Sequence, residues 1–341
     1  MIVFLGLVVY ELIILFLYNV AKTQQQKKWL YIFACLGILF VIGLRSENTG
    51  NDTPVYITHF LNLRNMAWDD IQYEFTRDHG FYYFVKFLTL FIDSPVMFIL
   101  ITSFISLIGI FDLFWRNSKS PVLSIYFYIT LGNFFFILTG IRQAIAMSVC
   151  MLAVRFIQER KLGWFVLFIC IAAQMHHSAY IFVVMYFLGT RKVNIVSMFT
   201  SIVVTVVAYF SYENLLGIVN DVLDYDYGVE ETGNGGIFFV ILLIINALAL
   251  MSKAAWVREK RGLVILNSSI ICNILWVFRL IGRTAERPSM YWLNVVPVAL
   301  SESIESVYDR EMRTYITVGS IVVSLAFFAY RSMGIPYAFC F

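Results

Sequence analysis

Two histidines and an isolated arginine interrupt long apolar runs of this sequence. Arg142 lies in "GIRQAIAMSV", and His176 and His177 lie in "AAQMHHSAY". A guanidinium can grip a phosphate or carboxylate with two hydrogen bonds, whereas a neutral imidazole can act as a general base or bond a sugar hydroxyl. These residue types therefore predict an anion site close to a site of proton transfer.

A second group of arginines strengthens the expectation of an anion site. In "FRLIGRTAERPSMYW", Arg279, Arg283 and Arg287 are four residues apart, so one continuous helix would place them on one face. They repel one another unless an anion or Glu286 neutralises them, and Pro288 then breaks or starts a helix. Single arginines of this kind often only reach toward lipid headgroups. The triplet together with Arg142 favours a bound anion.

The elements that position these residues must be membrane helices. Of 341 residues 60% are hydrophobic and only 14% charged, and the mean hydropathy is +0.78. Apolar runs of nearly spanning length recur along the chain, which predicts an all-α polytopic membrane protein. The first run, 2–20, lacks a basic start and a small-residue cleavage site, so we expect it to be retained as a span.

The basic residues predict the topology. Most of them cluster in short gaps between apolar runs, and placing these gaps in the cytoplasm puts both termini and the unusual arginines outside. We expect a single integral membrane domain over 1–341 with about twelve spans, and between about ten and fourteen. The predicted spans are 2–20, 29–44, 95–115, 121–138, 141–157, 163–177, 178–190, 194–211, 236–252, 263–280, 288–300 and 314–330.

Two external loops stand out. The loop 45–80 is expected to carry a short interfacial helix capped by Asp52 or Thr53, while 211–236 is acidic and rich in glycine. Two other segments allow alternatives: 163–190 either turns back on itself or forms one long helix, and 80–95 is re-entrant or lies in the interface.

Other titratable residues predict little chemistry by themselves. Most carboxylates of the 45–80 loop are expected to face solvent; they are Glu47, Asp52, Asp69, Asp70, Glu74 and Asp78. The five cysteines are scattered, so neither a metal site nor a disulfide framework is expected. No motif indicates a nucleotide, and we expect no cofactor.

Several motifs, in this order, resemble the EpsG-like family, a branch of the Wzy-type O-antigen and capsular polysaccharide polymerases. They are "LRSENTGNDTPVY" (44–56), "GIRQAIAMSV" (140–149), "AAQMHHSAY" (172–180) and "AERPSMYW" (285–292). The resemblance implies a GT-C-like membrane glycosyltransferase of the bacterial inner membrane, with its site facing the periplasm or exterior. It would transfer a growing glycan from undecaprenyl diphosphate to the non-reducing-end sugar of a new lipid-linked unit, making O-antigen, capsule or exopolysaccharide. Its partners would be that lipid-linked oligosaccharide, membrane lipid and a chain-length regulator, and no nucleic acid.

The resemblance and the residue chemistry together assign roles. The catalytic candidates are His176, His177 and Asp52. The diphosphate-binding candidates are Arg142, Arg283, Arg287, Arg45 and Arg279, of which Arg279 and Arg283 rest on helical spacing alone. The substrate-binding candidates are Gln143, Tyr56, Tyr291 and Glu286. Arginines can stabilise a departing diphosphate by electrostatics, so a metal-independent reaction is expected.

Three other functions remain as alternatives. A polysaccharide ligase would share the architecture and the diphosphate chemistry. A non-enzymatic transporter or flippase of lipid-linked sugar predicts charges through the membrane depth and internal repeats, whereas the charges here cluster at one face. A membrane acyltransferase would use a histidine but leaves the arginines without a role.

Overall fold

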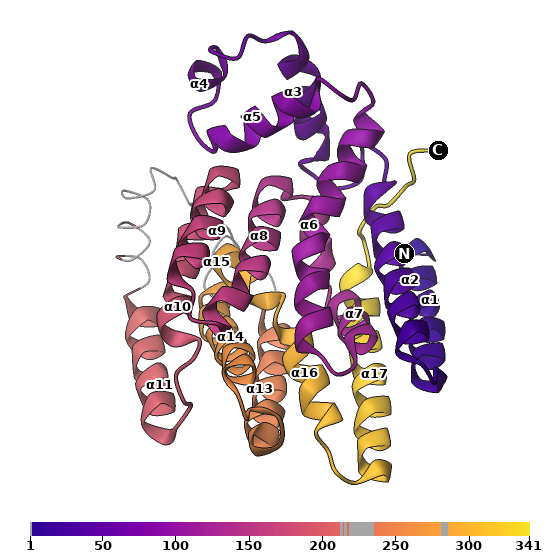
Figure 1. The fold of residues 1–341 in the computed structure, drawn as a ribbon, viewed down its shortest axis with the longest axis vertical. Helices are drawn as coiled ribbons and strands as arrows, with labels where there is room; N and C mark the ends of the chain where they lie inside the picture. The colour runs from indigo at the N-terminus through magenta and orange to yellow at the C-terminus, as the bar shows by residue number, and fades with distance from the viewer. Residues whose placement is uncertain (1, 212–213, 215–216, 218–234, 281–285) are drawn as a thin grey trace.

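Long helices packed side by side make up most of the molecule. The computed structural model describes residues 2–211, 214, 217, 235–280 and 286–341, and shows a helical bundle with a small lobe at one end (Figure 1). Among the described residues, seven helical segments are long and apolar enough to cross a membrane. They are α1 (Ile2–Val20), α2 (Gln24–Gly43), α6 (Pro95–Asn117), α8 (Ile141–Gln158), α13 (Gly236–Trp256), α14 (Lys260–Trp276) continued by η3 (Val277–Leu280), and α17 (Arg310–Ser332). The all-α polytopic class is confirmed.

The other predicted spans coincide with short or interrupted helices. For example, Gly132 in the left-handed region separates α7 from η1. These elements are α7 (Pro121–Thr130), η1 (Asn133–Leu138), α9 (Leu162–Met175), η2 (His177–Val183), α10 (Val184–Leu188), α11 (Ile195–Phe210), α15 (Glu286–Leu293) and α16 (Val296–Glu305). The predicted acidic loop 211–236 lies almost wholly outside the described residues.

The segment 163–190 is not one long helix. Helix α9 ends at Met175, and the backbone of His176 is extended, with φ −157° and ψ 115°. After η2, the chain returns toward the start of α9. The hydrogen bond of 2.6 Å from Arg160, just before α9, to the carbonyl of Tyr186 in α10 shows this return. The two histidines therefore lie at the turn of a helical hairpin.

The lobe consists of α3 (Thr53–Asn65), α4 (Ile71–Glu74) and α5 (His79–Leu88). Pro54 stands in the first turn of α3 and Asp52 occupies the capping position, but the Asp52 side chain makes no capping hydrogen bond. The hydroxyl of Thr53 instead donates 3.0 Å to the carbonyl of Leu138, which fixes the start of α3 to the bundle. The segment 80–95 therefore belongs largely to a lobe helix rather than to a span.

Two close contacts fix the helices that carry the lobe and the site. A Cβ added to Gly109 of α6 would lie 1.9 Å from the carbonyl oxygen of Ser148, so α6 and α8 cross with no room for a side chain. At the root of the lobe, the amide of Ser46 donates 2.8 Å to the carbonyl of Ala338, and Cys340 donates 3.0 Å to that of Leu44. The C-terminal segment thus holds the end of α2 in place.

Candidate functional site

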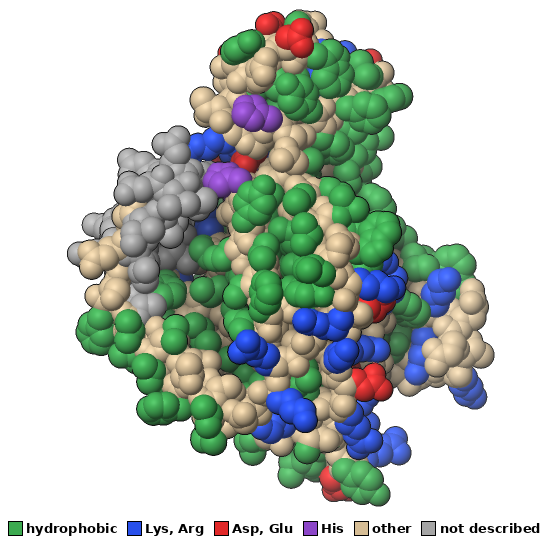
Figure 2. Space-filling model, turned by 60° about the vertical axis from the view of Figure 1, so that its left-hand side comes forward, with side chains coloured by type: hydrophobic (Ala, Val, Ile, Leu, Met, Phe, Trp, Pro, Cys, Tyr) green, Lys and Arg blue, Asp and Glu red, His purple; other side chains and the backbone are tan. Residues whose placement is uncertain are grey.

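A cavity of about 290 Å³ lies where the lobe meets the bundle. Histidine side chains and charged side chains reach the surface near this junction (Figure 2). The lining combines α3 and α5 of the lobe with the starts of α8 and α15 and the turn after α9. Its residues are Asp52, Val55, Tyr56, His59, Tyr82, Phe136, Thr139, Gly140, Arg142, Gln143, His176 and Arg287.

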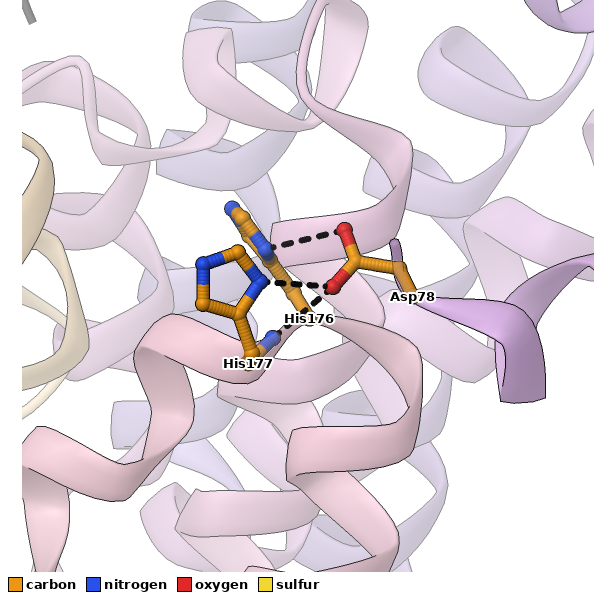
Figure 3. A group of neighbouring side chains, drawn as sticks. All are labelled: Asp78, His176 and His177. Carbon is orange, nitrogen blue, oxygen red and sulfur yellow. Dashed lines mark hydrogen bonds and ion pairs between the residues drawn. The ribbon is translucent and has the colours of Figure 1, made fainter. Parts of the chain in front are cut away.

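Asp78 lies beside this cavity and binds both histidines. Its Oδ1 is 2.9 Å from Nδ1 of His177 and accepts the backbone N–H of the same residue at 3.0 Å (Figure 3). Its Oδ2 is 3.2 Å from Nδ1 of His176. Arg142 donates to that oxygen at 3.0 Å. One carboxylate therefore organises three of the charged or titratable side chains at the junction.

The buried position of Asp78 is a correction to the expectation for this loop. Asp78 is only 7% exposed and adopts φ 53°, in the left-handed region that Asp and Asn tolerate better than most residues. Gly80 lets α5 approach α9, because a Cβ there would lie 2.5 Å from the Cβ of Gln174. The pattern Asp-His-Gly before an apolar helix is the sequence signal for this turn, but not for its distant partners.

The environment sets the protonation states of the group. Burial by itself raises the pKa of Asp78, but the hydrogen bonds with His176 and His177 lower it more, so the net pKa lies well below the usual carboxyl range. Burial lowers the pKa of His176 from 6.5, and Asp78 opposes that change only in part. Near neutral pH, Asp78 is therefore ionised and His176 neutral.

Asp78 also determines which ring nitrogen of each histidine can act as a base. A carboxylate beside Nδ1 favours the proton on that nitrogen, which leaves Nε2 with its lone pair. In Figure 3 the second ring nitrogens of His176 and His177 point away from Asp78. His176 lines the cavity although it is only 4% exposed, so its basic nitrogen belongs to a ring in the cavity wall.

Arg142 is held by protein groups on two sides. Besides its ion pair with Asp78, its guanidinium carbon lies 5.8 Å from the centre of the Tyr82 ring. Gln143, the next residue, donates 2.9 Å to the carbonyl of Arg287 and so ties α8 to α15. Arg287 itself is exposed and lines the cavity. The structure thus places Arg142, Gln143 and Arg287 around one cavity, and their role in binding an anion stays a prediction.

Four other candidates lie apart from the cavity or have protein partners. Arg45 is fully buried and donates to the Ile42 carbonyl at 2.6 Å and to Ser103 at 3.0 Å. Arg279 forms an ion pair of 2.7 Å with Glu286.

The ring of Tyr291 is fully buried and its hydroxyl lies 2.9 Å from that of Ser178, so a sugar cannot stack on it. Arg279 lies in the 3-10 turn η3 that follows α14 and not in a continuous α-helix, and residues 281–285 lie outside the described part of the chain. Arg283 lies outside the described residues.

The group Asp78, His176 and His177 also has the composition of a metal site. One ligand atom from each residue lies within 4.8 Å of the others. Histidine with carboxylate is a common ligand set for zinc. The hydrogen bonds already explain the arrangement, and the Arg142 guanidinium next to Asp78 repels a cation. The geometry fits an oriented histidine better than a metal centre, and metal independence stays a prediction.

Comparison with known proteins gives one match. Among curated proteins and among solved structures, none matches the chain. The sequence profile of the EpsG family matches residues 28–341, from the first turns of α2 to the C-terminal segment, and includes every residue that lines the cavity of about 290 Å³. Both the order of the motifs and this match over nearly the whole length agree, so the chain belongs to the EpsG family.

Proposed function

We propose that this protein polymerises lipid-linked oligosaccharide repeat units. Membership of the EpsG family supports a role in polysaccharide polymerisation in general. The observation that carries the specific proposal is the cavity in which Arg142 and Arg287 stand beside a carboxylate-oriented His176. Arginines suit a diphosphate leaving group, and a neutral imidazole suits activation of a sugar hydroxyl.

In the proposed reaction, the growing glycan is bound through its anomeric carbon to undecaprenyl diphosphate. A hydroxyl oxygen of the non-reducing-end sugar on a new lipid-linked unit attacks that carbon. The bond to the diphosphate oxygen breaks and the electron pair leaves with the diphosphate, so the anomeric configuration inverts. Arg142 and Arg287 stabilise the charge that develops on the leaving group. Nε2 of His176 takes the hydroxyl proton.

Asp52, Gln143 and Tyr56 have binding roles in this proposal. Asp52 is exposed at the cavity and can accept hydrogen bonds from sugar hydroxyls, and Tyr56 forms part of the wall. Gln143 acts indirectly, because its amide fixes the backbone of Arg287. Asp78 and His177 position His176 and Arg142.

The experiment is a surface-polysaccharide ladder on a gel from cells with and without the gene. Complementation uses the wild type, Arg287→Gln and the matched control Arg310→Gln at equal membrane abundance. Arg310 starts α17 and does not line the cavity. We expect the deletion to leave a single-repeat band, the control to restore the ladder and Arg287→Gln to fail.

Other outcomes would contradict the proposal. Loss of even the single-repeat band would indicate export or ligation instead of polymerisation. The deletion is made in a strain with no second polymerase gene. A ladder that persists in that strain would exclude the polymerase proposal. An assay with purified protein and a chelator tests the metal question, and we expect unchanged chain growth in its presence.

A further inference from the structure

A second cavity, of about 410 Å³, lies between the loop after α6, the loop between α13 and α14, and α16. These parts lie at the end of the bundle away from the lobe (Figure 1). On the face shown in Figure 2, Lys and Arg side chains gather toward that end. The cavity is lined by Asn117, Lys119, Ala255, Trp256, Arg258, Glu259, Arg261, Gly262, Ile265 and Glu302.

The charges of this cavity favour an anion. Three exposed cations line it: Lys119 in the loop after α6, Arg258 in the loop between α13 and α14, and Arg261 in the first turn of α14. Of the two carboxylates, Glu302 is only 7% exposed and accepts the backbone N–H of Lys119, so one of its oxygens already serves the protein. Three exposed cations therefore outnumber the two carboxylates of the cavity, the buried Glu302 and the exposed Glu259.

The start of α14 adds further positive character. Glu259 stands at the capping position of this 17-residue helix, but its side chain makes no capping hydrogen bond. Arg261 and Gly262, in the first turn, line the cavity. The first N–H groups of a helix lack partners within it and carry the positive end of its dipole, which binds phosphate well.

We infer that this second cavity binds the phosphate group of a net negatively charged ligand, either the headgroup of an anionic phospholipid or a soluble phosphate ester. Arginine forks, a lysine and a helix start recognise phosphate oxygens, and basic pockets between membrane helices commonly hold anionic lipid headgroups. Trp256 and Ile265 supply an apolar wall for the carbon skeleton beside the phosphate. The inference is independent of the proposed polymerase function, because it uses none of the residues near Asp78.

The test measures binding to full-length protein purified in detergent at low salt. The probes are short-chain phosphatidylglycerol, glycerol 3-phosphate, inorganic phosphate and, as the zwitterionic control, short-chain phosphatidylcholine. The variant Arg258→Gln/Arg261→Gln removes two cations of the cavity. The matched control Arg191→Gln/Arg310→Gln removes two exposed arginines that do not line it.

We expect phosphatidylglycerol to bind the wild type and the control alike, and the cavity variant roughly 25-fold more weakly, since a basic residue near an anionic headgroup contributes about 1 kcal/mol. Binding of phosphatidylglycerol alone identifies a lipid ligand, whereas equal binding of glycerol 3-phosphate or phosphate identifies a soluble one. No binding of any anionic probe over phosphatidylcholine, or equal binding by the cavity variant, would overturn the inference. If the double variant is not monodisperse, Lys119→Gln replaces it, with an expected loss of roughly fivefold.

Discussion

At the scale of residues, His176 and His177 share one carboxylate but differ in what they can reach. Both Nδ1 atoms contact Asp78, yet only His176 lines the cavity. The backbone N–H of His177 also donates to Asp78, so this residue already fixes the carboxylate without its ring. The two adjacent histidines, which the sequence leaves equivalent, are therefore expected to have unequal roles.

His176→Gln is expected to lower the polymerisation rate by about 100-fold or more, because a general base contributes about that much. His177→Gln is expected to lower the rate by less than about tenfold, since its backbone contact with Asp78 persists. The measurement is the initial rate of chain growth with purified protein in vesicles. Equal losses in the two variants would refute the assignment of the base to His176.

The pH dependence follows from the lowered pKa of His176. A histidine whose pKa is lowered in the folded protein stays neutral below 6.5, so activity and the stability associated with this group are full above that pH. As the pH falls, the stability already declines from 6.5 down to the lower pKa of the folded site, because the unfolded chain takes up the proton first. The activity declines only as the pH falls through the pKa of the folded site. We therefore expect the acid limb of the rate profile to lie below pH 6.5.

Asp78→Asn tests whether this carboxylate sets the pKa of His176. Because Asp78 raises the pKa of His176 against the effect of burial, its removal is expected to move the acid limb to still lower pH. The rate at the optimum is expected to fall by at least about tenfold, since the tautomer is no longer fixed. Asparagine tolerates the left-handed backbone at this position, so the fold should persist. An acid limb that stays in place or rises would show that Asp78 does not act through His176.

At the scale of elements, the site depends on how closely α5 approaches α9. Gly80→Ala places a Cβ 2.5 Å from that of Gln174, so α5 or α9 has to shift, and we expect Asp78 to move away from the histidines. Overpacking of this kind costs about 1–3 kcal/mol. We expect a lost ladder with the bundle still folded, measured together with the melting temperature. Gly163→Ala in α9 is the control, because nothing lies within 4 Å of its added Cβ. Full activity of Gly80→Ala would show that this contact does not position the site.

The hydropathy pattern predicts most of the helices of the fold. The contacts within the site are harder to predict, because they join residues that are far apart in the sequence. Hydropathy and basic clusters predict the positions of the long helices, because the chemical signal of a span is contained within the span itself. The turn at His176 follows from the need to keep both flanking basic clusters on one side. Tyr291 and Arg45 behave differently, since their burial depends on helices far away in the sequence.

Asp78 is the clearest example of what the sequence conceals. Its loop is polar and its neighbours are charged, so a solvent-facing side chain is the local expectation. Its partners are about a hundred residues away at His176 and His177, and the close approach of Gly80 to Gln174 brings α5 and α9 together beside that contact. No local pattern in a single sequence indicates a contact between residues that lie so far apart along the chain.

At the scale of the whole molecule, the lobe and the cavity beside Asp78 lie at one end, and on the face shown in Figure 2 lysines and arginines gather toward the other end (Figures 1 and 2). The distribution of basic residues predicts that the lobe faces the exterior.

Tyr73 on the lobe is 79% exposed, and Tyr308 at the opposite end is 99% exposed. Tyr73→Cys should react with a membrane-impermeant thiol reagent in intact cells, and Tyr308→Cys only after permeabilisation. The unsubstituted protein, with its five cysteines, gives the background. Labelling in the reverse pattern would invert the topology.

The lobe packs around its own apolar cluster, which includes Phe60, Leu63, Ile71 and Phe81 and meets the bundle through Phe98, Ile99, Ile141 and Ile145. A unit with a separate core can be exchanged as a module, because a graft needs only a compatible contact surface. Under the proposed function, the bundle supplies the arginines and the histidine, whereas the lobe supplies Asp52, Tyr56 and Tyr82. Chimeras can combine one bundle with the lobes of different relatives, provided that each lobe keeps the carboxylate of Asp78 that contacts the histidines. Such chimeras would then separate the choice of sugar from the chemistry of transfer.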